Sequence, residues 1–215
     1  MLMLESRREF STSKTDAKAF PTNKRPVNLD QRRVRDPVVQ ASVVKVETKP
    51  LERRLTPLID KWNLYYHLPY DKTWDVQSYK LIMGDIETTE QLIGINEVMP
   101  DEVVKTCMLF VMKSGVLPLW EDTNNRQGGA FSFKILNKSV HLVWRQLFYL
   151  MCGGTLMVNR AHMPLVNGIS ISPKKGFCIV KIWLRDCSLQ DPETIAEIPD
   201  LCKRECLFRK HEPEF

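Results

Sequence analysis

The chain has 215 residues, of which 43% are hydrophobic and 27% are charged, enough for one medium-sized globular domain with a tail. It has no run of about 18 apolar residues, so we expect no membrane-spanning helix. Charged residues follow the start MLML too closely for a signal peptide, so the expected location is the cytoplasm, without a membrane partner.

The formal net charge of +5 is unevenly distributed. The excess of Lys and Arg lies in residues 1–54, whereas residues 55–215 are close to neutral. Residues 1–54 lack Gly and Trp and show no sustained hydrophobic period, so we expect a disordered basic tail. This charge fits a solubilising arm, a salt-sensitive contact with RNA, or both. Within the tail, Pro37–Val46 (PVVQASVVKV) fits either a partner-pairing strand or a less polar piece of tail, and we favour the second.

From Thr56 onward the sequence predicts regular elements, assigned by alternation for strands and by three-to-four-residue spacing for helices. The first half predicts a strand over Lys61–Leu68, a loop with room for a short strand over 73–82, and a helix over Thr88–Met99 that is capped by Thr88 or Thr89. It also predicts strands over Cys107–Lys113 and Gly128–Ile135. The second half predicts a helix over Lys138–Cys152, hairpin strands over Gly168–Ser172 and Phe177–Leu184, a helix over Asp191–Cys206 kinked at Pro199, and an edge strand from Cys206. Together these elements predict an α+β fold: a curved antiparallel β-sheet with about three helices packed on its convex face.

Six cysteines and four histidines raise the question of a metal site. The cysteines lie mostly in or beside apolar runs, and neither they nor the histidines form the paired ligand set that zinc requires. We therefore expect reduced structural thiols and no metal; Cys202 and Cys206, four residues apart, are expected to share one helix face.

Five tryptophans divide into two groups. Trp62 and Trp144 lie inside apolar-patterned elements and are expected in the core. Trp74 and Trp120 lie on loop-like stretches beside acids, in YDKTWD and LPLWED, and Trp183 ends an apolar strand. For these three residues two interpretations stay open: a rim indole that covers the core, or the wall of a ligand site.

The pairing of Trp120 with Glu121 favours a ligand site for one class of ligand. Two parallel indoles form a slot for a flat ring, and a positively charged ring gains about 0.5–2 kcal/mol from each indole face. A carboxylate at the back of the slot accepts two N–H donors from the edge of guanine. A methylated, cationic guanine meets both demands, whereas ordinary guanine meets the second alone.

Four motifs are similar to those of the eukaryotic initiation factor 4E family, whose members bind the 7-methylguanosine cap of messenger RNA. They are TPLIDKW with Thr in place of the family's His, KTW (Lys72–Trp74), GVLPLWED (Gly115–Asp122) and VKIW (Val180–Trp183). KTW and PLWED at this separation are together quite specific evidence for the family, although either motif alone would be weak evidence. The resemblance runs from Thr56 to about Cys206 and implies a cap-binding domain over residues 55–215, with the cap in the concave face of the sheet.

The resemblance also implies roles for individual residues of this site. Trp74 and Trp120 would sandwich the methylated base, Glu121 would accept the N1–H and N2–H of guanine, and Trp183 would lie against the N7 methyl group.

The match to the family is looser where the cap phosphates would bind. Arg126 stands about where the family has one phosphate-binding Arg, and Lys174 falls on a second such position. Ile179 occupies the third basic position, so one contact is lost or is supplied by Lys175. The alternative for Lys174 and Lys175 is a solvated hairpin tip.

The partner-binding face departs further from the family. There, the Pro of the opening motif and a Trp on the first helix bind a short helical motif of a scaffold or repressor. Pro57 is retained, but Ile93 holds the Trp position, and Arg145 and Tyr149 hold two apolar surface positions of the long helix. Since Ile93 cannot make the hydrogen bond of an indole, we expect a partner whose motif differs from the usual one.

These features predict a monomeric, noncatalytic adapter without a cofactor. It would bind capped mRNA and recruit an initiation scaffold of the factor 4G type or another 4E-interacting protein. Two alternatives stay open: a repressor that occupies the cap without recruiting the scaffold, and a general single-stranded RNA-binding module. An enzyme is disfavoured because the sequence has no P-loop, no GxGxxG and no carboxylate cluster for a catalytic metal. The divergence suggests an unusual paralogue or a protist protein of trypanosomatid type.

Overall fold

The computed structural model describes residues 55–213. The tail, with its Pro37–Val46 segment, lies outside the described residues, and the boundary between tail and domain stays a prediction. The strands are β1 (Pro57–His67), β2 (Lys80–Thr88), β3 (Met108–Lys113), β4 (Gly129–Leu136), β5 (Val166–Pro173), β6 (Phe177–Leu184) and β7 (Leu207–Lys210). The α-helices are α1 (Thr89–Val98), α2 (Asp101–Thr106) and α3 (Val140–Cys152), and four short 3-10 helices are η1 (Val76–Ser78), η2 (Arg160–Leu165), η3 (Pro192–Thr194) and η4 (Lys203–Glu205).

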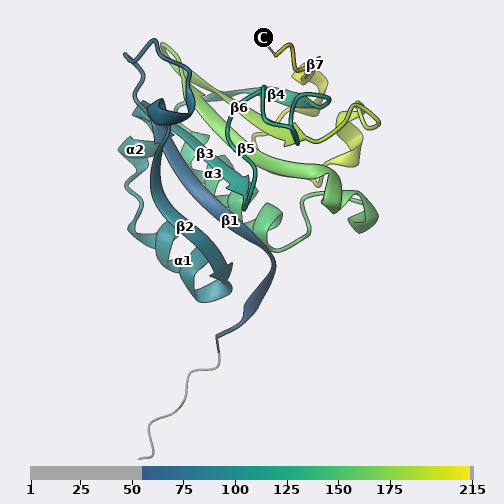
Figure 1. Cartoon of the computed structure of the whole chain (residues 1–215), viewed down its shortest axis with the longest axis horizontal. Helices are drawn as coiled ribbons and strands as arrows, with labels where there is room; N and C mark the ends of the chain where they lie inside the picture. Colours follow the sequence, from purple (N-terminus) through teal and green to yellow (C-terminus); the bar gives the residue numbers. More distant parts are fainter. Residues whose placement is uncertain (1–54, 214–215) are drawn as a thin grey trace, which may run out of the picture. The chain divides into compact units, whose positions relative to one another are not determined.

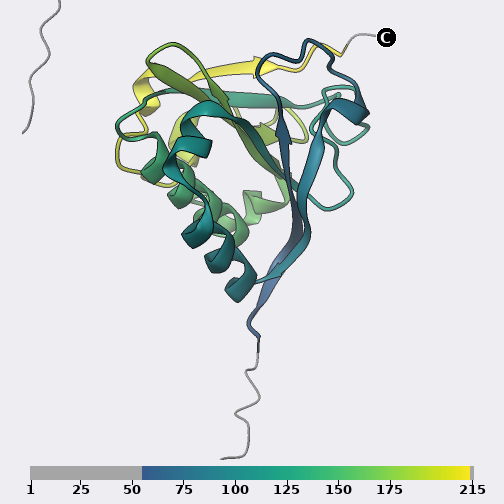
Figure 2. The same cartoon turned by 90° about the vertical axis from the view of Figure 1, so that its left-hand side faces the viewer.

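The seven strands form one curved antiparallel sheet with the order β2-β1-β3-β5-β6-β4-β7 (Figure 1). Figure 2 shows the teal and green helices together on one side of the sheet. The other side, which we call the open face, carries no α-helix of the described residues. The predicted α+β class, with helices on one face of an antiparallel sheet, is confirmed.

Alternating residues of the central strands build a separate apolar cluster on each face of the sheet. In β3, Leu109 and Val111 belong to the main core under the helices, whereas Phe110 belongs to a smaller cluster on the open face. In the same way, Ile182 of β6 enters the main core and Trp183 enters the open-face cluster. Functional side chains on the open face are thus mounted on strands whose other side is anchored in the core.

The core assignments for Trp62 and Trp144 are confirmed, since each side chain is 1% exposed. The predicted cap of the first helix is confirmed as well. The Thr88 side chain accepts a hydrogen bond from the Gln91 amide, and the Gln91 side chain accepts one from the Thr88 amide, which completes a capping box.

Two elements, β2 and α2, were largely missed, and β1 begins at Pro57, before the predicted Lys61. Strand β2 spans nine residues, and the predicted loop with room for a short strand overlaps only its start, at residues 80–82. It lies at the sheet edge and Ile86 is its one buried residue, so the alternation that identifies a half-buried strand is absent. Helix α2 has six residues, too few to show a helical period.

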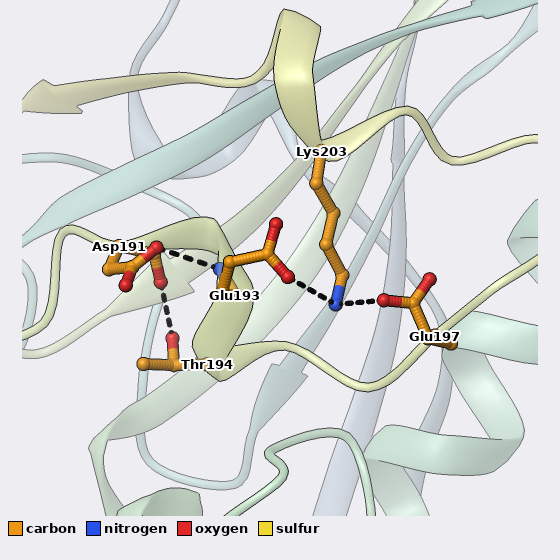
Figure 3. A network of polar contacts seen from close by, with 5 residues as sticks. All are labelled: Asp191, Glu193, Thr194, Glu197 and Lys203. Carbon is orange, nitrogen blue, oxygen red and sulfur yellow. Dashed lines mark hydrogen bonds and ion pairs between the residues drawn. The ribbon is translucent and has the colours of Figure 1, made fainter.

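The helix predicted over Asp191–Cys206 is wrong. The segment forms the three-residue elements η3 and η4, and the chain between them turns at Pro199 and Asp200. Pro199 cannot donate a helical hydrogen bond. Figure 3 shows the ion pairs that link the two turns: Lys203 Nζ lies 2.6 Å from Glu197 Oε1 and 3.4 Å from Glu193 Oε2. The helical spacing of Ile195, Ile198 and Leu201 has another cause: the irregular chain places all three side chains in the core.

Within residues 55–213, no helix is long and apolar enough to cross a membrane. All six cysteines lie in the described part, where each is a free thiol. Cys202 and Cys206 do not share a helix face, because they flank the short turn η4.

Candidate functional site

A cavity of about 410 Å³ opens on the open face of the sheet. Its walls include five aromatic side chains: Trp74, Tyr79, Phe110, Trp120 and Trp183. Its polar lining consists of Glu121, Ser170, Ser172, Lys181 and Glu212. The four residues that the sequence assigned to base recognition thus come from three separate segments and line one cavity.

Trp74 lies on the loop between β1 and η1, with 53% of its surface exposed. Its indole stacks on the buried ring of His67, the last residue of β1, with ring centroids 4.3 Å apart and planes 6° apart. The same loop is held by Asp71, whose side chain accepts a hydrogen bond of 2.9 Å from the Thr73 amide. This hydrogen bond is the main reason that the pKa of the Asp71 carboxyl group is lowered.

Trp120 lies on the turn-rich segment between β3 and β4 and is 37% exposed. Its indole stacks on His211, with centroids 5.6 Å apart and planes 13° apart. The buried side chain of Asn125 donates hydrogen bonds of 2.8 Å to the carbonyl oxygens of Leu117 and Leu119, which fixes the chain just before Trp120.

Trp183 contributes a buried wall of the cavity, since it is 4% exposed. Its indole N–H donates a hydrogen bond of 2.8 Å to Ser170 Oγ on the neighbouring strand β5. The ring meets Phe110 edge to face, with centroids 6.4 Å apart. Trp183 is therefore not a rim residue that covers the main core, because it belongs to the cluster of the open face.

Glu121 lies beside Trp120 in the chain and lines the cavity close to Tyr79. Burial raises the pKa of the Tyr79 phenol, and the negative charge of Glu121 raises it further. Tyr79 is therefore a neutral hydroxyl at physiological pH.

The cationic lining of the cavity differs from the predicted set. Lys181 of β6 lines the cavity, and its Nζ lies 5.5 Å from the ring centroid of Trp120. Burial lowers the pKa of this lysine most, followed by the positive charges of Arg209 and Lys174. The three predicted phosphate ligands, Lys174, Lys175 and Arg126, are all exposed and lie outside the cavity lining. Only Lys174 is near enough for its charge to contribute to the lowered pKa of Lys181.

The four predicted partner-binding residues lie at the start of β1 and on helices α1 and α3. Pro57 is exposed, and 46% of the Ile93 surface is exposed. Tyr149 is half-buried against the main core. The half-buried Arg145 donates a hydrogen bond of 3.1 Å to the carbonyl oxygen of Asn96 and so joins α3 to α1.

Sequence reasoning missed several side chains at or next to the site, including Lys181, Arg209, His211 and His67. One carried a usable signal: Lys181 lies two residues before Trp183 on one strand, so both point to the same face. Arg209 and His211 reach the site because β7 pairs with β4, a long-range contact that no local pattern reveals. His67 had a visible place in its strand, but nothing in the sequence showed that Trp74 folds back over it. Among residues 55–213, no group of three or more His, Cys, Asp or Glu side chains is placed to hold a metal ion.

Comparison with known families gives one family assignment. A family model described as eukaryotic initiation factor 4E matches residues 57–213. The chain is 24% identical to the eukaryotic translation initiation factor 4E of Candida glabrata over 147 residues, which cover 66% of this chain and 68% of the relative. It is 26% identical to the factor of Saccharomyces cerevisiae over 147 residues, which cover 66% of each chain.

Solved structures agree with this assignment at the level of the fold. Caenorhabditis elegans eIF4E-3, in complex with the 4E-binding protein Mextli and a cap analog, matches with a TM-score of 0.56 and 21% identity, covering 63% of this chain and 77% of that chain. Ascaris suum eIF4E-3 with m7G cap matches with the same TM-score and identity, covering 64% and 77%. Since the family model spans the folded part from β1 to the residues after β7, the chain belongs to the eukaryotic initiation factor 4E family.

Proposed function

We propose that this protein binds the 7-methylguanosine 5′ cap of mRNA in the cavity of the open face. The observation that carries the proposal is the convergence of Trp74, Trp120, Glu121 and Trp183 on that one cavity. In this proposal the cationic base stacks between the indoles of Trp74 and Trp120, and Glu121 accepts the two N–H donors of guanine. Trp183 lies against the N7 methyl group.

The cap phosphates would lie toward the cationic side of the cavity. Lys181 supplies the nearest ammonium group, and Arg209 and Lys174 supplement it. Phosphate oxygens would offset the cost of burying the Lys181 charge, which its lowered pKa indicates. Arg126 and Lys175, the other two predicted phosphate ligands, are exposed and become available once the nucleotide extends beyond the cavity.

On the helix-covered side, the proposed partner is an initiation scaffold of the factor 4G type or another 4E-binding protein with a helical motif. The C. elegans relative solved with Mextli supports a partner of this kind. The docking surface would include Pro57, Ile93, Arg145 and Tyr149. Because Ile93 offers no N–H donor and Arg145 already bonds to α1, we propose a partner motif that relies on apolar contacts at this point.

We further propose that the protein is a noncatalytic, monomeric cytoplasmic adapter, with residues 1–54 as a tail and 55–215 as the cap-binding domain. One observation favours the repressor as a second candidate: Ile93, in place of the family's Trp, weakens the surface that recruits the scaffold. Trypanosomatid origin stays a prediction.

The test is equilibrium binding of one short RNA with and without its cap, using the full chain at physiological salt. We expect much tighter binding of the capped RNA and loss of this preference in Trp120→Ala. Deletion of residues 1–54 should change the preference little. Equal affinity for both RNAs, abolished by removal of the tail, would instead identify a general RNA-binding module.

A further inference from the structure

Each of the two indoles proposed to sandwich the cap base is stacked on a histidine. His67 is parallel to Trp74, and His211 is parallel to Trp120. Both histidines are buried, at 0% and 3% exposure, and neither is part of the cavity lining. Each histidine therefore covers one face of an indole that itself lines the cavity.

Each histidine also contacts the backbone of the loop that carries its tryptophan. Nε2 of His67 lies 2.8 Å from the carbonyl oxygen of Thr73, the residue immediately before Trp74. Its Nδ1 lies 3.0 Å from the carbonyl oxygen of Leu68, at the start of the same loop. One ring thus lies against both ends of the loop segment, where the nitrogen that carries the proton donates to the carbonyl oxygen it faces, and the ring also sets the plane of the indole.

His211 makes the equivalent arrangement on the other wall. Its Nδ1 donates a hydrogen bond of 2.7 Å to the carbonyl oxygen of Asn125, and the side chain of Asn125 in turn holds the residues before Trp120. The His211 amide donates to the carbonyl oxygen of Gly128, which fixes the histidine to the end of this loop. Burial lowers the pKa of the His211 ring, and Lys181 lowers it further, so a neutral ring stacks on the indole.

We propose that His67 and His211 are positioning residues of the cap site, which hold the two indoles in place before the ligand arrives. The inference rests on the proposed cap binding and extends it, because it makes the chain after β7 part of the site. The physical reason is entropic. An exposed indole on a loop loses rotamer freedom when it stacks on a base, and a ring already stacked on its back face has lost most of that freedom.

The test compares matched substitutions in the full chain, with affinity for 7-methyl-GTP measured by titration calorimetry. His67→Leu and His211→Leu remove both the flat ring and its donor, whereas His67→Phe and His211→Phe keep the flat ring. We expect each Leu variant to lose about 3- to 10-fold in affinity, the range for one aromatic pair, and each Phe variant to recover most of it. His162→Leu, in η2 outside the cavity lining, is the control and should bind like wild type.

A second readout separates positioning from a general loss of structure. In ligand-free protein labelled with 5-fluorotryptophan, His67→Leu should alter the ¹⁹F resonance of Trp74 and leave that of Trp120 unchanged. His211→Leu should do the reverse, and thermal unfolding checks that each variant is folded.

Two outcomes distinguish the possible failures. Wild-type protein that does not prefer 7-methyl-GTP to GTP would refute cap binding, and with it a role for the histidines in that binding. Wild-type preference together with folded Leu variants that bind within about 2-fold of it would overturn the positioning role alone. A Phe variant as weak as its Leu counterpart would show that the flat ring is irrelevant and would also overturn the inference.

Discussion

Lys181 Nζ lies over the ring of Trp120, 5.5 Å from its centroid, on the strand that also carries Trp183. The proposed base-stacking wall and the proposed phosphate ligand are therefore neighbours. A cation placed here can reach the phosphates that extend from the sandwiched nucleoside. Burial beside the ring is also the main reason that the pKa of Lys181 is lowered.

Replacement of Lys181 by Met should weaken binding of 7-methyl-GTP about 10- to 100-fold, because a hydrogen bond to a charged phosphate is lost. The nucleoside 7-methylguanosine, which has no phosphate, should bind wild type and variant alike. Calorimetric titration with the two ligands measures the difference. Equal losses for nucleotide and nucleoside would show that Lys181 supports the stacking wall and does not bind phosphate.

The same lysine predicts a pH dependence of stability. Its folded-state pKa is lowered from 10.5, so burial of the charged form opposes folding at neutral pH. Ligand-free Lys181→Met should therefore unfold about 2–4 °C higher than wild type at pH 7. At pH values between the folded-state and unfolded-state pKa of Lys181, the folded wild type binds fewer protons than the unfolded chain. The stability of the wild type therefore rises with pH, and the difference in unfolding temperature between Lys181→Met and wild type narrows. A thermal series up to about pH 10 tests this; a gap that widens with pH would contradict it.

Replacement of Glu121 by Gln should reduce affinity for 7-methyl-GTP about 10- to 100-fold, because a neutral amide replaces a charged acceptor of two guanine donors. Glu197→Gln, an exposed carboxylate outside the cavity lining, is the matched control. Quantitative elution from immobilised 7-methyl-GTP would detect the loss. Retention of Glu121→Gln at wild-type strength would remove Glu121 from base recognition.

On the partner-binding side, Ile93→Trp should strengthen binding of a standard 4E-binding helical peptide about 5- to 10-fold, since an indole adds apolar contact and an N–H donor. Ile82→Trp, at a similarly exposed position on edge strand β2, should have no effect. Fluorescence anisotropy of the labelled peptide provides the measurement. Tight wild-type binding that Ile93→Trp leaves unchanged would mean that Ile93 is not a point of contact.

The sequence predicted best where a local pattern reports a local structure. The threonine cap of α1, the alternation in β4 and β6 and the period of α3 all depend on neighbours in the chain. It predicted worst where tertiary contacts decide. Ile195, Ile198 and Leu201 have helical spacing, but they are buried side chains of an irregular segment. Ion pairs and two prolines determine the conformation of that segment.

The candidate site shows the same division. Trp74 and Trp120 were identified from short motifs and a family resemblance, and the structure places both on one cavity. Their stacking partners His67 and His211 were not identified, because each pairing depends on how a loop or the chain end folds back. Lys181 is part of the VKIW motif, but the family resemblance assigned no role to its position.

The most direct test is a titration of intrinsic tryptophan fluorescence in the full chain with 7-methyl-GTP and, separately, with GTP. Strong, saturable quenching by 7-methyl-GTP and little by GTP is the predicted result, because the cationic ring alone gains from both indole faces. Indistinguishable curves for the two nucleotides, or no quenching by either, would contradict a slot built by Trp74 and Trp120 for a methylated guanine.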